Sequence, residues 1–221
     1  MTSNTRGLST SIHAIFRAVT GFLILGSVIW QVSDRLSHGV FRGSEYFAYV
    51  TVQSSLLAGF ACLIGAWRLW NMQAESIRFG LARLSVTGYA VIVGVVYNAL
   101  LRGVPGDVRD AGYDWPTLPN EILHVWGPIF VFLDWLLSRE GSKISFKFFL
   151  WVLAYPVVWI SFTVVRGYST GWWPYPFLDP TQPAGGGGMV TYIVVIVVFL
   201  AVTCLVALST VKALYRIRAT A

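Results

Sequence analysis

Long apolar runs separated by short polar segments dominate this chain. A helix needs about 20 mostly apolar residues to cross the hydrocarbon layer of a bilayer. Six runs approach or exceed that length, and the last is the clearest, because no charged residue lies between Thr191 and Thr210. The pattern predicts an all-α polytopic membrane protein that forms a single domain over residues 1–221, with spans at residues 11–31, 46–70, 79–101, 118–137, 146–165 and 189–213.

The composition supports a membrane protein and argues against a soluble one. Hydrophobic residues make up 56% of the chain and charged residues 12%, whereas soluble domains have roughly 25% charged residues. The net charge is +6, but the basic residues lie between the apolar runs and not along one stripe, so nucleic acid is not an expected partner. The expected partner is the lipid bilayer, and the composition leaves the oligomeric state open.

The basic residues also predict an orientation, because cytoplasmic loops are enriched in Lys and Arg. Eleven of the 16 Lys and Arg residues lie at the termini and in or beside the second-to-third and fourth-to-fifth connections. The other five lie around the remaining connections, namely Arg35, Arg42, Arg102, Arg109 and Arg166. Both termini are therefore expected in the cytoplasm.

The sequence offers little support for a metal or an organic cofactor. Cys62 and Cys204 lie in separate apolar runs, without the paired spacing of a metal site. Bis-histidine haem ligation needs two histidines at facing depths. Of His13, His38 and His124, His124 alone lies well inside a predicted span. We therefore expect no metal and no cofactor.

Polar residues from three predicted spans fall at a similar depth near the outer boundary. The helical rise of 1.5 Å per residue places Thr51 about 7 Å, His124 about 9 Å and Asn98 about 5 Å below that boundary. Tyr97 and Arg102 flank the same layer. A hydroxyl and an imidazole at matched depth can act as a nucleophile and its base, so Thr51 and His124 are the candidate catalytic pair.

Each of these residues also has a structural interpretation. A membrane-helix Thr commonly bonds the carbonyl four residues earlier, and a buried His can do the same with a neighbouring carbonyl. An ionisable residue inside a membrane is nevertheless a functional candidate by default. Asn120 and Glu121 lie one turn before His124 and could orient its ring, although Glu121 could equally be a solvated charge. Asp134 lies too deep for this site and is expected to pair with Arg139 or another inner cation.

The last outer connection, residues 167–188, is rich in Pro and aromatic residues, and its part from Trp172 to Pro180 cannot form a regular helix. One interpretation is an aromatic belt at the lipid headgroups. The other is a lid over a pocket mouth.

Three segments carry a family resemblance: Tyr46-Phe-Ala-Tyr-Val-Thr-Val-Gln-Ser-Ser-Leu56, a His early in the fourth span, and Trp173-Pro-Tyr-Pro-Phe-Leu-Asp179. Together they resemble the androgen-induced gene / androgen-dependent TFPI-regulating protein family, and more closely its bacterial six-pass branch. The resemblance implies an integral-membrane hydrolase of the bacterial plasma membrane that cleaves fatty acid esters of hydroxy fatty acids. It also implies that Thr51 is the nucleophile and His124 the essential histidine.

These expectations combine into a specific mechanism. A lipid ester enters from the outer leaflet, Thr51 attacks its carbonyl, and His124 takes the hydroxyl proton. Asn98, Tyr97, Arg102 or Trp126 could donate to the oxyanion. The rival hypothesis is a small transporter or lipid-binding scaffold that uses the same polar layer as a ligand site.

Overall fold

The computed structural model describes residues 7–74, 76–104, 107–138, 143–181 and 188–220. Helices make up almost all of this part of the chain, and it contains no strand. The α-helices are α1 (Leu8–Ser37), α2 (Gly43–Tyr46), α3 (Val50–Trp70), α4 (Ile77–Val96), α5 (Thr117–Glu121), α6 (Gly127–Leu137), α7 (Ala154–Thr170) and α8 (Gly188–Thr220). Two π-helical segments are η1 (Tyr97–Leu101) and η3 (Ile122–Trp126), and three 3₁₀ segments are η2 (Val108–Asp110), η5 (Phe146–Leu153) and η6 (Pro176–Leu178).

Five of these helices are long and apolar enough to cross a membrane: Leu8–Ser37, Val50–Trp70, Ile77–Leu101, Phe146–Thr170 and Gly188–Ile217. The chain therefore has the character of an integral membrane protein. The predicted fourth span is not among the five. Its segment is divided between α5, η3 and α6, and it carries Asn120, Glu121, His124 and Asp134, which lower its apolar content.

The predicted start of the second span is wrong. The short helix α2 ends at Tyr46, and α3 begins only at Val50 after an extended Tyr49. The side chain of Gln53 stabilises this break, because its amide donates a hydrogen bond of 2.7 Å to the carbonyl of Phe47. Thr51 consequently lies in the first turn of α3, and not a turn and a half into a longer helix.

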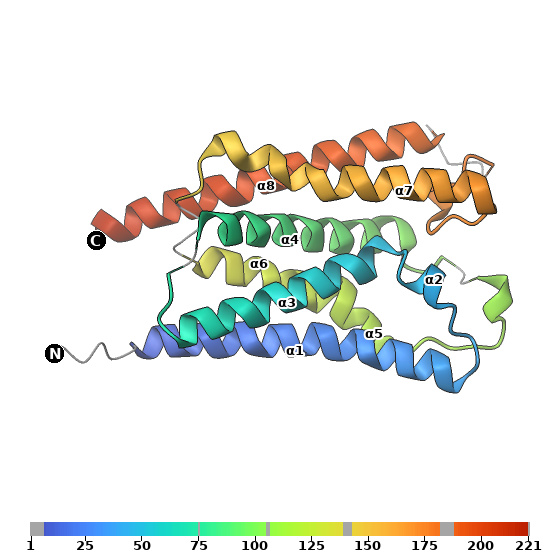
Figure 1. Ribbon diagram of the computed structural model, residues 1–221, viewed down its shortest axis with the longest axis horizontal. Coiled ribbons are helices and arrows are strands. Elements are labelled where there is room, and N and C mark those ends of the chain that lie inside the picture. Colours follow the sequence, from blue (N-terminus) through green and yellow to red (C-terminus); the bar gives the residue numbers. More distant parts are fainter. Residues whose placement is uncertain (1–6, 75, 105–106, 139–142, 182–187, 221) are drawn as a thin grey trace.

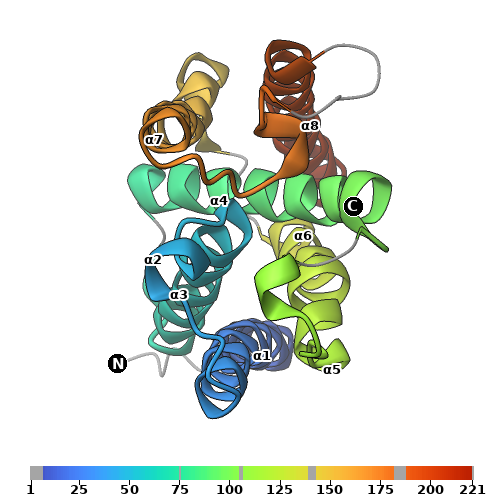
Figure 2. The ribbon, with the colours of Figure 1, turned by 90° about the vertical axis from the view of Figure 1, so that its right-hand side faces the viewer.

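The helices run lengthwise in one bundle (Figure 1). α1 packs along α3, and α4 lies between this pair and the pair formed by α7 and α8. Figure 2 shows α7 and α8 on the same side of α4 but apart from each other. α1 begins and α8 ends at the same end of the bundle, which will be called the terminal end; α2 and η6 lie at the opposite end, the loop end.

A buried ionic cluster ties three helices together toward the terminal end. Asp134 of α6 accepts hydrogen bonds of 2.7 Å from Arg17 of α1 and from Arg83 of α4. His13 lies 2.7 Å from the same carboxylate, and Arg83 also donates to Ser138. Asp134, Arg17 and Arg83 are all buried. The expected pairing of Asp134 with an inner cation is confirmed for Arg17 and Arg83, whereas Arg139 lies outside the described residues.

Ion pairs also join the connections at the loop end. Arg42 lies 2.7 Å from a carboxylate oxygen of Asp110, and Arg109 donates to Glu45 and to Asp107. These contacts link the segment before α3 to the segment after η1. The two connections that the sequence assigns to one side of the membrane therefore lie together.

Candidate functional site

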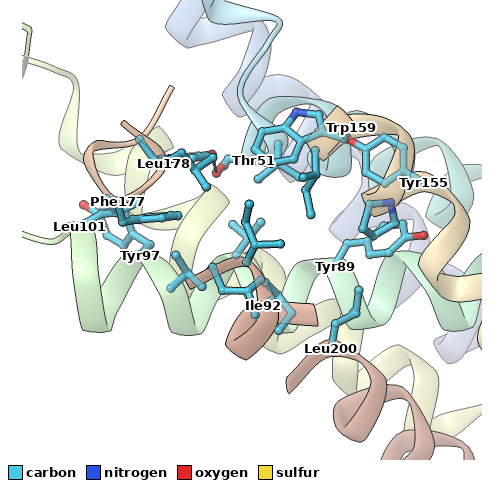
Figure 3. Close-up of a pocket in the computed structure, with 18 residues that line it drawn as sticks. Thr51, Tyr89, Ile92, Tyr97, Leu101, Tyr155, Trp159, Phe177, Leu178 and Leu200 are labelled. Carbon is cyan, nitrogen blue, oxygen red and sulfur yellow. Dashed lines mark hydrogen bonds between the residues drawn. The ribbon is translucent and has the colours of Figure 1, made fainter. Parts of the chain in front are cut away.

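An apolar cavity lies between α4, α7 and α8 near the loop end, and Figure 3 shows the residues around it. Its volume is about 80 Å³. Among the residues that form the cavity wall, Tyr97, Leu101 and Phe177 lie toward one end of the cavity. Tyr89, Tyr155 and Leu200 lie toward the other end. Thr51 is also part of the wall. An almost wholly apolar wall therefore includes one threonine.

Thr51 does not make the helix contact that would explain it as a structural residue. Thr20, Ser27 and Ser85 each donate a hydrogen bond to the carbonyl four residues earlier in their own helix. The Thr51 hydroxyl instead lies 3.4 Å from the phenol oxygen of Tyr175. Because Thr51 is in the first turn of α3, the residue four positions earlier lies outside the helix. Its hydroxyl is thereby left to contact Tyr175.

Two π-helical segments face each other beside the cavity, and single-turn π segments are frequent at functional sites. Pro128 explains an important contact between them. Proline has no N–H group, so it cannot bond the carbonyl of His124, its partner in a regular helix. That carbonyl instead faces the Asn98 side-chain amide, 3.3 Å away. Gly94 allows the close approach, since an added Cβ atom would lie 3.2 Å from Pro128 and 3.3 Å from the His124 carbonyl.

The contacts of His124 define its tautomer. Its Nδ1 atom lies 2.8 Å from the carbonyl oxygen of Asn120. A carbonyl oxygen can only accept, so Nδ1 carries the proton and the lone pair of a neutral ring lies on Nε2. The ring stacks on Tyr97 with a centroid separation of 3.9 Å. This arrangement leaves Nε2 able to act as a base.

The predicted polar residues around His124 form one network. The amide of Asn120 donates to the Tyr97 hydroxyl at 2.7 Å, while its backbone carbonyl holds the His124 ring. Arg102 joins η1 to the end of α5 by donating to Asn98 at 2.9 Å and pairing with Glu121 at 2.8 Å. Asn120 therefore orients the imidazole through its main chain, and Glu121 neutralises Arg102 without contacting the ring.

Two of the sequence expectations fit this geometry less well. Trp126 is half-exposed, packs near Phe130 and does not line the cavity. Within the described residues, no hydrogen bond joins Thr51 to His124. The two are related through Tyr97, which lines the same cavity as Thr51 and stacks on His124. In the described structure a proton has no direct hydrogen bond along which to pass between them.

The sequence predicts no specific role for Tyr175, although the segment that contains it is unusually rich in Pro and aromatic residues. Tyr175 comes from the connection after α7, and it is 6% exposed. Burial raises the pKa of its phenol to about 12, although hydrogen bonds from Thr51 and Val50 oppose the rise. Tyr175 is therefore a neutral hydroxyl beside Thr51. The signal in the sequence was a polar aromatic residue held between two prolines.

The connection after α7 folds back over the cavity and does not lie flat as an aromatic belt. α7 ends at Thr170, and the φ of 72° at the next residue, Gly171, turns the chain back toward the bundle. Tyr175, Phe177 and Leu178 are buried and form part of the cavity wall. The segment thus covers the cavity, as expected of a lid, while the end of the connection, residues 182–187, lies outside the described residues.

In the described segments, no three His, Cys, Asp or Glu side chains are grouped as metal ligands would be. Comparison of the chain with models of protein families, with curated proteins and with solved structures finds no match. The site is therefore interpreted from its own geometry, and the family resemblance stays a prediction.

Proposed function

We propose that this chain is an intramembrane hydrolase that cleaves a lipid ester, with Thr51 as the nucleophile and His124 as the base. The observation that carries the proposal is Thr51, which lines an apolar cavity and whose hydroxyl contacts Tyr175 and not the carbonyl four residues earlier in the chain. A fatty acid ester of a hydroxy fatty acid, or a similar lipid, would place its acyl chain among the apolar side chains and its ester at Thr51. The protein would then span the membrane six times, with α5, η3 and α6 as the fourth pass and both termini in the cytoplasm.

The contacts of His124 support its assignment as the base. Its Nδ1 proton is held by the Asn120 carbonyl, which leaves Nε2 to accept the proton of Thr51. Tyr97 lines the cavity wall and holds the imidazole by stacking, which places the proposed base behind that wall. No metal or organic cofactor is needed for this chemistry.

The cavity also suggests how a lipid reaches Thr51. Its walls include Ile160 of α7 and Ile193 of α8, and these two helices lie apart in Figure 2. Their outer faces carry exposed apolar side chains such as Val158 and Val194, which suit contact with lipid. Entry between α7 and α8 would keep the acyl chain in an apolar environment throughout.

The rival function is a small transporter or a lipid-binding scaffold that holds the same lipid without cleaving it. The absence of a direct hydrogen bond between Thr51 and His124 in the described structure favours this alternative. In that case Thr51 and Tyr175 would recognise a polar headgroup, and the bound lipid would be recovered intact.

A product assay separates the two functions. Purified protein in nanodiscs is incubated with a palmitic acid ester of hydroxystearic acid, and the free acids are measured by mass spectrometry. Hydrolysis at Thr51 predicts acid release by wild type and none by Thr51→Ala. Thr20→Ala is the matched control, because Thr20 is also buried in a span but bonds its own helix. Release at equal rates by wild type and Thr51→Ala would contradict the proposal.

A further inference from the structure

Three of the polar groups that line the cavity already donate their protons to protein oxygens. Tyr89 donates to the carbonyl of Val152 at 2.7 Å, and Tyr155 donates to Gln53 at 2.8 Å. The indole of Trp159 donates to the carbonyl of Ala48 at 2.9 Å. These three groups hold the bundle together and have no proton left for a ligand.

Tyr97 and Tyr175 differ from those three. The Tyr97 hydroxyl accepts a hydrogen bond from Asn120, and its ring is stacked on His124. The Tyr175 hydroxyl has one polar side-chain neighbour in the described structure, the hydroxyl of Thr51. Of the two phenols, Tyr175 is therefore the one in contact with the proposed nucleophile.

The ring of Tyr175 is held firmly by aromatic neighbours. It stacks on Phe177 with parallel rings 5.2 Å apart, and it meets Tyr49 edge-on at 5.6 Å. Such packing fixes the position of the phenol oxygen, so little ordering of the side chain is needed when a ligand binds. The contact with Thr51 is long for an O–H···O hydrogen bond, so exchanging it for a carbonyl oxygen of a ligand costs little.

We propose that Tyr175 donates the hydrogen bond that stabilises the oxyanion formed when Thr51 attacks a lipid ester, an inference that rests on the proposed hydrolase function. As the Thr51 oxygen bonds to the carbonyl carbon, the π electron pair moves onto the carbonyl oxygen and the Thr51 proton passes to His124. Tyr175 donates to that oxygen and keeps its own proton. When the carbonyl re-forms, the bond to the alcohol oxygen breaks, and the alcohol takes the proton from His124. Water then attacks the acyl-threonine in the same way and releases the acid.

The geometry and the state of Tyr175 support this assignment over the other candidate donors. The raised pKa of its phenol keeps it protonated at every working pH. Asn98 is occupied by the carbonyls of Gly94 and His124. Arg102 is exposed and paired with Glu121, so neither competes for an oxyanion beside Thr51.

The test is the Tyr175→Phe variant, which keeps the ring and removes the hydroxyl. Hydrolysis of p-nitrophenyl decanoate is followed in detergent micelles, and binding of a long-chain trifluoromethyl ketone and of decanoic acid is measured on the same samples. The ketone forms a tetrahedral adduct with a nucleophilic hydroxyl and so imitates the oxyanion, whereas decanoic acid reports the acyl-chain site. Tyr46→Phe is the matched control, since it removes another buried hydroxyl, bonded to Gln31 at 2.9 Å, away from the cavity.

The expected result is a fall in kcat of roughly 10²- to 10³-fold for Tyr175→Phe with little change in KM, as for loss of one oxyanion donor. In Tyr175→Phe the affinity for the ketone should fall with kcat, while the affinity for decanoic acid and the melting temperature stay at wild-type values. The Tyr46→Phe control should keep the wild-type kcat and both wild-type affinities. Wild-type kcat in Tyr175→Phe, with Thr51→Ala inactive, would overturn the role of Tyr175 and leave the hydrolase standing. A lower affinity for decanoic acid together with a lower melting temperature would show that Tyr175 has a packing role only. No turnover by folded wild type would overturn both proposals.

Discussion

The imidazole of His124 stacks on the phenol ring of Tyr97, with ring centroids 3.9 Å apart. Because Tyr97 also lines the apolar cavity, this stack joins the π-helical segments to the wall that contains Thr51. The side-chain amide of Asn120 also anchors Tyr97, and the backbone carbonyl of Asn120 fixes the tautomer of His124. The position of the proposed base and the shape of the proposed substrate site are therefore determined together.

Substitution of Thr51 separates a nucleophile from a packing residue. Thr51→Ser keeps the hydroxyl and should retain activity within roughly tenfold, whereas Thr51→Ala should lose roughly 10³-fold or more, because no nucleophile remains. Rates of lipid ester hydrolysis and melting temperatures of both variants provide the measurement. Similar activity in the Ser and Ala variants would mean that the methyl group matters and the hydroxyl does not.

The buried carboxylate of Asp134 should be essential for stability. Asp134→Asn leaves Arg17 and Arg83 buried without their anionic partner, and breaking a buried pair in this way costs roughly 3–5 kcal/mol. Thermal unfolding in detergent measures the loss. Asp114→Asn is the control, because Asp114 is exposed and its change should stay within about 0.5 kcal/mol. Equal melting temperatures for the two variants would contradict this role of the cluster.

The close packing of α1 on α3 depends on the small size of Gly21. A Cβ atom at Gly21 would lie 2.9 Å from the carbonyl oxygen of Gly59 and 2.8 Å from Leu63. Gly21→Ala should therefore destabilise the protein by roughly 1–3 kcal/mol. Gly26 is the control on the same helix, since nothing lies within 4 Å of its added Cβ. Gly26→Ala should be neutral or stabilising, because Ala favours helix more than Gly, and equal destabilisation of both variants would exclude this explanation.

Acid should weaken the ion pairs at the loop end. The hydrogen bond from Arg109 lowers the pKa of Asp107 to about 2. Burial alone would raise the pKa of Glu45, but Arg109 and Arg42 lower it overall. Both carboxylates are therefore more acidic in the folded than in the unfolded chain. The stabilisation that they provide is complete above about pH 4, which is near the pKa of these carboxyl groups in the unfolded chain. It is lost as the pH falls toward about 2.

The measurement is the melting temperature between pH 7 and pH 2, in wild type and in Arg109→Gln. The melting temperature of wild type should stay constant down to about pH 5 and fall below about pH 4. The melting temperature of the variant should fall less over the same pH range. Raising the salt concentration should also reduce the effect, because these groups are near the surface. Identical pH profiles in the two proteins would show that Arg109 does not set the acidity of this cluster.

The sequence predicted the helical architecture well, because apolar runs of membrane-spanning length have few alternative structures. It also indicated that Thr51, Asn98 and His124 share one layer, with Tyr97 and Arg102 beside it and Asn120 and Glu121 one turn away. In the described structure the last six of these residues form one network, whereas Thr51 has no hydrogen bond to His124. It did not predict the late start of α3, which depends on the contact between Gln53 and Phe47. Nor could helical spacing reveal the contact between Thr51 and Tyr175, because a connection 124 residues away folds back to form it.

Labelling by a fluorophosphonate probe tests the central claim most directly, because the probe forms a covalent bond only with an activated hydroxyl. Purified wild type, Thr51→Ala, His124→Ala and Thr20→Ala are labelled in nanodiscs, and the modified peptide is identified by mass spectrometry. The account predicts an adduct on Thr51 in wild type and in Thr20→Ala, and no adduct in the folded Thr51→Ala and His124→Ala variants. Folded wild type that forms no adduct, or one at another residue, would contradict Thr51 as the nucleophile.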